Sequence, residues 1–528
     1  NPYPLLSVIY PGLEMAAGSK VNLKYVGTNH LSFLGSFPHV GLNKRVATNL
    51  DLEIDVLLKS QDENGPGQSR LLAMKAAGRC DQLMVADSMN IKGLTLVSEI
   101  SDDSASFRLN WDNQIEPNYA GNLDGFVLFE NVEGQASRLP GRFARVVLEN
   151  SWLTIADSNW TMQGENPIAF NQKSVIIDDW QVFRGKRKLR VNGASSNVDP
   201  GGIKLSFEGF RLSVFNHLTR KRDWKWKGIV EGDVTISGIY KVPYAFGNIS
   251  ISNMGVNDKL FGNLKVVSKW DQPTNKINTN IELSNGNITP IQINGNYDLE
   301  QARLEDGTPL DFNVDIAKLY PHIFQPFVRS VFSEVSTRSM VSGNLNLVGS
   351  LEKPVLLGAL DVHKGGVRLA YTNVEYDFAN QVVFKDSLIA FENLVVNDKK
   401  GNQAMVNGRI YHDYLRDLRF DISAEPDGLH SLNTIEEQNK LYYGQGYSSG
   451  LLRFSGTRDN LNISSTLKTK SGTKIYIPMM DASETASVSF VSFVSDKYPA
   501  VLNLNETNSS KCTIKLPEIN FDTEITPD

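Results

Sequence analysis

Hydrophobic and polar residues alternate along most of this chain. Clear examples are Ile281 and Leu283, Ile291 and Ile293, and Phe312, Val314 and Ile316, each set interrupted by polar residues. A period of two predicts β-strands whose successive side chains point to opposite faces of a sheet. Strands buried on both faces would read as continuous apolar runs, so one face of each strand is expected to contact water.

Asn-Gly and Asp-Gly pairs indicate where these strands turn. Both dipeptides supply the positive φ angles of tight hairpins, so the pattern predicts consecutive antiparallel strands. The pairs begin at Asn64, Asn192, Asn285, Asn294 and Asn407, and at Asp124, Asp306 and Asp427. Helical signals are confined to residues 323–332 around Pro326 and to residues 434–443, with Asn433 as a candidate N-cap. The prediction is an all-β chain with one or two short helices.

One building block occurs more than once. Residues 232–251 align with residues 343–362, and glycines, aliphatic residues and one proline match at a constant offset. The alignment extends to residues 256 and 367, and a fainter copy occupies residues 450–477. Each copy predicts a strand, a glycine-led turn and a second half-apolar strand, so each would extend a sheet.

The apolar face can be covered in two ways. Sandwiches or barrels would pack it as an ordinary core, and the pattern taken alone favours them. A single antiparallel sheet that curls into a U-shaped groove would instead leave an apolar interior. Lipid acyl chains would then supply the missing half of the core.

Composition and charge indicate a folded protein and disfavour nucleic acid binding. The 528 residues are 41% hydrophobic and 21% charged, which is typical of a folded protein. The net charge of -6 includes no long basic block beyond Arg220–Arg222, so nucleic acid binding is disfavoured. No apolar run is long enough to cross a bilayer, so a membrane anchor is expected outside these residues.

Candidate catalytic and metal-binding residues are few. His412 and Asp413 are adjacent strand residues that point to opposite faces, so they are not expected to converge on one substrate atom. Asp102-Asp103 and Asp178-Asp179 are paired acidic residues beside turns and are expected to be solvated. Ser448 stands in a G-x-S-x-G match that lacks the strand-to-helix context of a nucleophile. The only cysteines, Cys80 and Cys512, form no metal-binding pattern. The sequence predicts no enzyme, no metal and no cofactor.

Several segments carry a family resemblance. They are "GRFARVVLENSWLTIADSNW" from Gly141, "YPHIFQPFVRSVFS" from Tyr320, "GNLNLVGSLEKPVLLG" from Gly343, "NGRIYHDYLRDLRFDI" from Asn407, "LNTIEEQNKLYYGQGYSSG" from Leu432 and "SGTKIYIP" from Ser471. The chain from about Gly141 onward resembles TamB, of the AsmA-like bridge proteins, as it occurs in Bacteroidota. Residues 141–528 are therefore expected to form a TamB-like segment, and residues 1–140 a β-rich groove segment that resembles the family only in its β character.

The resemblance implies a β-taco fold in the periplasm. It also implies an N-terminal inner-membrane anchor outside this segment and an outer-membrane barrel partner of the TamA or BamA-like class. Contact with that partner is expected outside these residues or at their C-terminal end. Two roles follow: phospholipid transport between inner and outer membrane, and, as the alternative, assembly or translocation of outer-membrane proteins.

Alternation also predicts which residues would contact phospholipid acyl chains in such a groove. The candidates are aliphatic or aromatic residues that share one face of a predicted strand. They are Val234, Ile236, Leu264, Val266, Ile281, Leu283, Ile291, Ile293, Phe312, Val314, Ile316, Leu345, Leu347, Leu360, Val362, Ile389, Phe391, Leu418, Phe420, Ile422, Leu461, Ile463, Ile475 and Ile477.

Overall fold

The computed structural model describes residues 13–27, 29–42, 45–58, 71–86, 89–101, 103–114, 119–130, 143–155, 158–162, 167–214, 216, 224–329, 331–439, 442–457 and 461–478. Its 31 strands belong to one antiparallel sheet. The sequence-based prediction of an elongated, curled all-β sheet is therefore confirmed.

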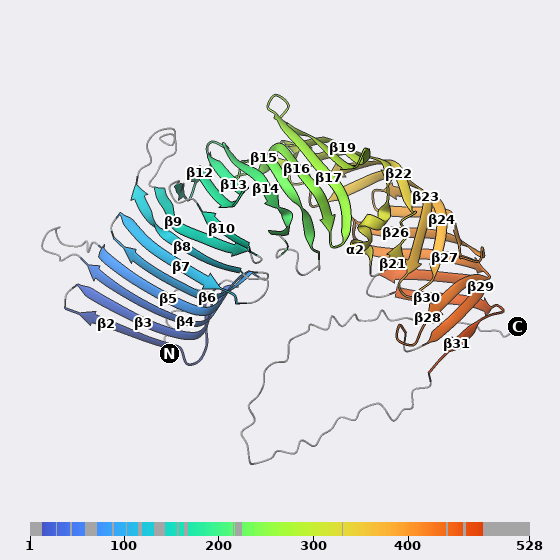
Figure 1. Ribbon diagram of the computed structural model, residues 1–528, viewed down its shortest axis with the longest axis horizontal. Coiled ribbons are helices and arrows are strands. Elements are labelled where there is room, and N and C mark those ends of the chain that lie inside the picture. Colours follow the sequence, from blue (N-terminus) through green and yellow to red (C-terminus); the bar gives the residue numbers. More distant parts are fainter. Residues whose placement is uncertain are drawn as a thin grey trace, which may run out of the picture. The chain divides into compact units, whose positions relative to one another are not determined.

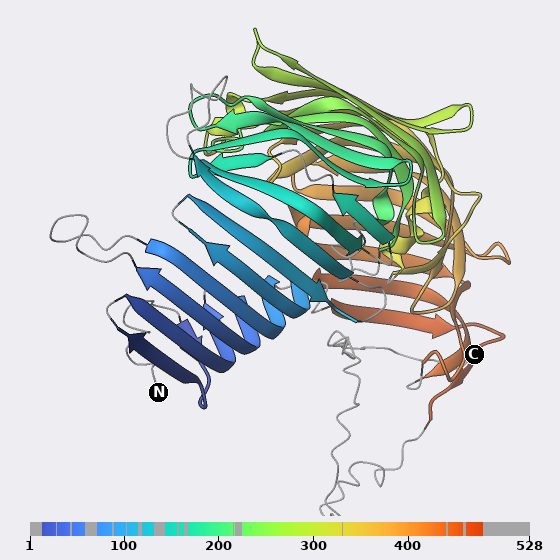
Figure 2. The same cartoon turned by 60° about the vertical axis from the view of Figure 1, so that its left-hand side comes forward.

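The chain divides into two compact units. Unit 1 comprises residues 1–287 and 297–305. Figures 1 and 2 show its strands from β2 to β9 side by side in sequence order. Its strands are β1 (Leu13–Met15), β2 (Lys20–Val26), β3 (His30–Leu42), β4 (Arg45–Leu58), β5 (Leu71–Ala86), β6 (Met89–Ile100), β7 (Ser104–Asp112), β8 (Tyr119–Glu130), β9 (Phe143–Ile155), β10 (Ser158–Met162), β11 (Ile168–Asn171), β12 (Ser174–Arg184), β13 (Arg187–Ser196), β14 (Gly202–Arg211), β15 (Trp226–Ser237), β16 (Tyr244–Val256), β17 (Lys259–Asp271) and β18 (Lys276–Asn285).

Unit 2 comprises residues 288–296 and 306–528. Its strands are β19 (Ile288–Asp298, of which the last two residues belong to unit 1), β20 (Leu310–Leu319), β21 (Phe332–Val335), β22 (Met340–Gly349), β23 (Pro354–Leu369), β24 (Glu375–Lys385), β25 (Leu388–Asn397), β26 (Gln403–Asp413), β27 (Arg416–Asp427), β28 (Leu429–Thr434), β29 (Tyr443–Thr457), β30 (Leu461–Thr469) and β31 (Lys474–Tyr476).

Helices are short in both units. The 3₁₀-helix η4 (Gln301–Arg303) lies in unit 1, and η5 (Pro321–Phe324) with α2 (Gln325–Val328) lies in unit 2. No described helix has the length and apolar character needed to span a membrane. The helix predicted at residues 434–443 is wrong: Thr434 ends β28, residues 436–438 form a turn and Tyr443 begins β29. Pairing of β28 with β29 overrides the local helical signal.

The three aligned segments form hairpins with corresponding registers. Gly232 pairs with Ile249 in the first, Gly343 with Leu360 in the second, and Gly450 with Leu467 in the third. The first two pairs are separated by the offset found in the sequence alignment. Each hairpin adds two antiparallel strands to the sheet of its unit.

Glycines inside these strands bring neighbouring backbones unusually close. Gly247 and Gly358 occupy equivalent positions and have φ angles of +154° and +131°. A Cβ atom there would lie 2.1 Å from the carbonyl oxygen of Asp233 and 2.4 Å from that of Asn344, respectively. Both positions therefore require glycine, and such glycines allow a strand to bend.

Most of the predicted Asn-Gly and Asp-Gly turns are wrong. Asn285 ends β18 and a turn follows it, but Asn192, Asn294, Asn407 and Asp124 lie inside β13, β19, β26 and β8. Asp306 lies in a turn, Asp427 ends β27 with the single bend residue Gly428 before β28, and Asn64 lies outside the described residues. The glycines after the in-strand residues permit close approach instead: a Cβ at Gly125 would lie 2.1 Å from the carbonyl oxygen of Val147.

Candidate functional site

Hydrophobic side chains form continuous rows across unit 1. In an antiparallel sheet, directly paired residues point to the same face, so strand register defines each row. One row contains Leu23, Phe33, Ile54, Ala76, Ser98, Phe107, Gly125 and Leu148, and runs from β2 to β9. A second row, two residues away, contains Val21, Gly35, Leu52, Gly78, Leu96, Leu109 and Leu123. We call this side the apolar face of unit 1.

The opposite side of the same strands is polar. Lys75 and Glu99 are directly paired and form an ion pair of 2.8 Å, and Arg108 pairs with Asp124 at 2.7 Å. Further along, Lys204 and Asp233 are 3.1 Å apart. These pairs are largely solvent-exposed, so they contribute little to stability, but they mark the wet side of the sheet.

The predicted groove residues of unit 1 share the apolar face. Val234 pairs with Gly247 and Leu205, and Ile236 with Ala245 and Ile203. The remaining four form two direct cross-strand pairs, which are Leu264 with Leu283 and Val266 with Ile281.

The predicted residues of unit 2 also share one face. One row contains Val314, Leu345, Gly358, Phe384, Ile389, Ile410, Phe420 and Gly456. Alternation or direct pairing places Phe312, Ile316, Leu347, Leu360, Val362, Phe391, Leu418, Ile422 and Ile463 on the same side. Ile291 and Ile293 follow because a Cβ at Gly295, in the same strand, would lie 2.8 Å from the Phe312 ring. This side is the apolar face of unit 2.

The C-terminal candidates are less clearly part of the apolar face of unit 2. Leu461 pairs with Gly456 through its backbone, and the structure does not describe its side chain. Ile475 pairs with Gly444 in the short strand β31 and is 41% exposed. Ile477 follows β31 and is 67% exposed. Their role in a groove stays a prediction, as it does for all the candidates.

Burial on the apolar face is incomplete. Among the candidates, Leu283, Ile316, Leu345 and Ile463 are buried, whereas most of the others are half-buried and Leu418 is 38% exposed. In a closed sandwich, residues facing the interior would be packed by a second sheet. The described protein atoms therefore leave much of this face accessible.

One group of side chains shows that the apolar face of unit 1 is concave. The rings of Trp160 in β10 and Phe210 in β14 are 5.1 Å apart. Strands β12 and β13 lie between them, so a flat sheet would separate the two strands by about 14 Å. The contact is made from the apolar side, so the sheet curls toward that side here.

A buried cluster fills this tightly curled part. Its core consists of Trp160, Met162, Val182, Phe210 and Val230. Leu148 of β9 and Ile251 of β16 also pack against it, although they lie on well-separated strands. We call this group the Trp160 cluster. It is a local protein core within an otherwise accessible face.

Unit 2 closes on itself in a comparable way. The turn between β23 and β24 meets the connection from β28 to β29, although β24 to β27 intervene in the sheet. The Tyr442 hydroxyl donates to that of Tyr371 at 2.6 Å, and the Asn433 amide donates to the Thr372 carbonyl at 2.9 Å. The Asn373 side chain returns a bond to the Asn433 carbonyl at 2.9 Å.

A buried carboxylate supports this closure. Asp398 accepts hydrogen bonds from the His430 backbone at 3.0 Å and from the Asn402 side chain at 2.8 Å. Burial alone would raise the pKa of Asp398, but these bonds and those from the Asn402 and Lys400 amides outweigh it and hold the pKa below its usual range. Tyr376 on the apolar face donates to the His430 carbonyl at 2.8 Å, and burial raises the pKa of its phenol.

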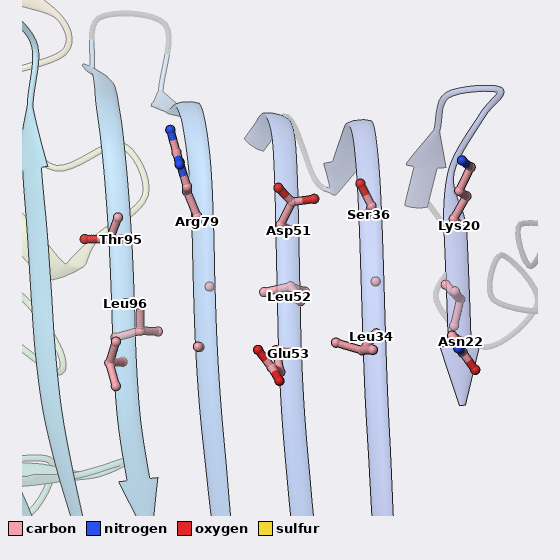
Figure 3. Close-up of a pocket in the computed structure, with 15 residues that line it drawn as sticks. Lys20, Asn22, Leu34, Ser36, Asp51, Leu52, Glu53, Arg79, Thr95 and Leu96 are labelled. Carbon is pink, nitrogen blue, oxygen red and sulfur yellow. The ribbon is translucent and has the colours of Figure 1, made fainter. Parts of the chain in front are cut away.

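In unit 1, a shallow hollow of about 600 Å³ crosses β2 to β6 on the side opposite the apolar face. Its floor follows Gly35, Leu52 and Gly78. Figure 3 shows the polar residues that flank this floor, which are Lys20 and Asn22 on β2, Ser36 on β3, Asp51 and Glu53 on β4, and Arg79 on β5. On the apolar side, the Phe37 and Phe33 rings fill the space above Gly35, at 2.6 and 2.9 Å from an added Cβ. The hollow therefore lies on the polar face, and its charges are mixed.

The candidate catalytic residues do not converge. His412 is buried and its Nδ1 accepts the Leu415 amide at 3.3 Å, whereas Asp413 is exposed. Asp179 accepts hydrogen bonds from Arg190 and Gln181, and Asp178 is exposed. Ser448 lies inside β29 and bonds Ser431 at 2.6 Å. The described part of the chain holds no group of metal-ligating side chains.

Sequence reasoning missed the N-terminal rows and the Trp160 cluster. Leu52, Ile54 and Val56 showed the alternation, so the rows could have been extended to β2 from the sequence. The Trp160 cluster carries no such signal, because β-bulges between Asn122 and Asp124 and between Ile177 and Trp180 change which residues share a face.

Comparison with known proteins gives one match. Residues 392–526 match the family model described as the TamB C-terminal domain. Searches of curated proteins and of solved structures return no match to this chain.

Proposed function

Because the chain belongs to the TamB family, which is linked to outer-membrane biogenesis, we propose that it carries phospholipid between the inner and outer membrane along its apolar faces. The observation that carries this proposal is the incomplete burial of long apolar rows. Side chains such as Val234 and Leu347 share a face with many others, yet the described protein atoms leave them half-buried.

The dimensions of the rows suit acyl chains. From β2 to β9, seven strand spacings of about 4.8 Å give a row of about 34 Å. One leaflet of a bilayer core is about 15 Å thick, so such a row exceeds the length of one acyl chain. Each buried methylene contributes about 0.8 kcal/mol, and a uniform wall makes successive positions similar in energy. Movement along the wall then needs no catalytic residue and no cofactor.

The family also guides the proposed cellular setting. The segment would lie in the periplasm of the cell envelope, tethered to the inner membrane by an anchor outside these residues. A TamA or BamA-like barrel in the outer membrane would be its partner. We do not propose nucleic acid as a partner.

Photo-crosslinking in cells tests the proposal. A crosslinking residue at Leu347 should capture phospholipid, whereas one at the neighbouring Asn346, which is exposed on the polar face, should not. Ile293 and Phe420 provide further positions on the apolar face. Crosslinks without lipid at all three apolar positions would contradict the proposal.

A charge in the wall provides an independent test. Leu347→Asp places a carboxylate among apolar side chains and should block lipid delivery to the outer membrane, because a charge is costly to desolvate. Asn346→Asp adds the same charge to the polar face and should leave delivery intact. Full delivery in Leu347→Asp, with the variant protein present at normal levels, would count against transport along this wall.

Assembly of outer-membrane proteins is the second candidate function. Strand β2 has one strand neighbour, β3, among the described strands, so it is an edge to which another strand could be added. This function predicts crosslinks to nascent outer-membrane proteins at β2. It also predicts normal activity in Leu347→Asp, which separates it from lipid transport.

A further inference from the structure

The apolar rows of β12 and β13 end in two arginines. Val182 and Leu189 are paired on the apolar face, and two residues further along their strands Arg184 pairs with Arg187. Side chains two residues apart point to the same face, so both arginines extend the apolar face at its edge. The next row inward contains Trp180 and Val191.

A third arginine joins this pair. The Arg187 side chain passes Gly209 of β14, where an added Cβ would lie 3.7 Å from its Cγ. Burial, followed by the positive charges of Arg211 and Arg184, lowers the pKa of Arg187. Arg187 therefore lies within reach of the positive charges of both Arg184 and Arg211. We call Arg184, Arg187 and Arg211 the arginine rim.

No carboxylate among the described residues forms an ion pair with the arginine rim. By contrast, Arg190 on the polar face pairs with Asp179. Within the rim, Arg184 donates to the hydroxyl of Ser158, which leaves most of its donors available. Like charges held together at the end of an apolar wall favour a bound anion.

The opposite ends of the same strands have no comparable charge. Ser174 and Ser196 are paired there and buried, and Ser195 and Ser196 donate to the backbone carbonyls of Pro200 and Asp199 at 2.8 and 3.1 Å. Across the described strands β12 and β13, an arginine cluster therefore lies at one end of the apolar rows and not at the other. A bound amphiphile would have a defined orientation across these strands.

We infer that the arginine rim binds the phosphate group of a lipid whose acyl chains lie on the apolar rows beside it. The guanidinium fork matches two phosphate oxygens, and each such bond is charge-assisted. Two residues of strand span about 6.6 Å, so the Val182 and Leu189 row begins one such step from the charges. The inference rests on the proposed lipid transport and adds the headgroup class and its position.

Binding measurements on the full chain test this assignment. The probes are monomeric dihexanoylphosphatidylglycerol, dihexanoylglycerol without phosphate, and inorganic phosphate. The double variant Arg184→Gln/Arg187→Gln should weaken phosphatidylglycerol binding by about tenfold or more, from loss of charge-assisted bonds. It should leave dihexanoylglycerol binding unchanged.

Two further variants make the test specific. Lys265→Gln/Lys269→Gln removes the same charge from the polar face of unit 1 and should bind all probes as the wild type does. Arg184→Lys/Arg187→Lys keeps the charge but loses the forked geometry, and should give an intermediate affinity. Because this lysine variant keeps the charge, its retained affinity shows that substitution at these two positions does not itself unfold the protein.

The outcomes distinguish the inference from the proposal beneath it. Equal phosphatidylglycerol affinity in the wild type and the double glutamine variant would overturn the arginine rim as a headgroup site. Inorganic phosphate bound as tightly as phosphatidylglycerol would overturn the lipid assignment. Failure of the wild type to bind dihexanoylglycerol would instead contradict an accessible apolar wall, and therefore the proposed transport itself.

Discussion

Truncation of Trp160 tests whether the Trp160 cluster is what holds unit 1 in its tightly curled form. Trp160 is 2% exposed and packs against Phe210 across two intervening strands. Trp160→Ala removes this contact and leaves a cavity in the Trp160 cluster. Among the described residues, this is the buried cluster found on the apolar face of unit 1. The sheet would then lose its main tie across β10 to β14.

The expected cost follows from opposing contributions. Burial of about 150–250 Å² for an aromatic side chain, at about 25 cal/mol per Å², gives about 4–6 kcal/mol. The Trp160 indole N–H has no hydrogen-bond partner among the described residues, so its removal recovers about 1–3 kcal/mol. The net loss of stability should be about 1–5 kcal/mol.

Hydrogen exchange of the full chain measures this loss locally. Since 1.4 kcal/mol corresponds to a factor of ten, amides of β10, β12 and β14 should exchange about 5 to 4,000 times faster. Trp152→Ala is the matched control, because Trp152 lies in the neighbouring strand β9 and is 41% exposed. Acceleration below about threefold in Trp160→Ala, or equal acceleration in both variants, would refute the reasoning.

Three further changes probe unit 2. Gly358→Ala should lower the free energy of unfolding, measured by urea denaturation, by about 1–3 kcal/mol, because φ is +131° and a carbonyl oxygen would lie 2.4 Å from the added Cβ. Gly78→Ala in unit 1 is the control and should cost less, because Gly78 has no positive φ. Asp398 has a lowered pKa, so its contribution is present above about pH 4 and is lost as pH falls further; Asp398→Asn should abolish that part of acid destabilisation in urea titrations from pH 2 to 7. Tyr442→Phe should cost about 0.5–1.5 kcal/mol and speed exchange of the Asn433 amide, whereas unchanged exchange would show that the contact with Tyr371 is dispensable.

The sequence allowed the faces of most strands to be predicted, because alternation needs only local information. Alternation within each strand selects Val314, Leu345 and Phe420 as groove candidates, and the strand register places them in one row. The aligned segments likewise contain equivalent glycines, which fix equivalent pairings in β15 and β22. Local pattern and strand register agree at these positions.

The predictions that failed depended on neighbours distant in sequence. Asn407-Gly408 resembles a turn, yet Gly408 lies inside β26 beneath the Phe391 ring, which is 2.0 Å from an added Cβ. Asn433 resembles a helix cap, yet its amide bonds to Thr372. The arginine rim was equally hidden, because the bulge between Ile177 and Trp180 sets the face on which Arg184 lies.

The in-strand glycines connect these failures to the proposed function. A flat sheet with one apolar face would need a second layer to cover it. Gly247 and Gly358 instead allow strands to bend and approach closely, while Val234 and Leu347 on the same strands or their partners remain half-buried. Each aligned hairpin therefore adds length to an apolar wall without changing its local chemistry. Acyl affinity at one position should then be independent of how many such hairpins the chain contains, whereas the distance a lipid can travel should grow with their number.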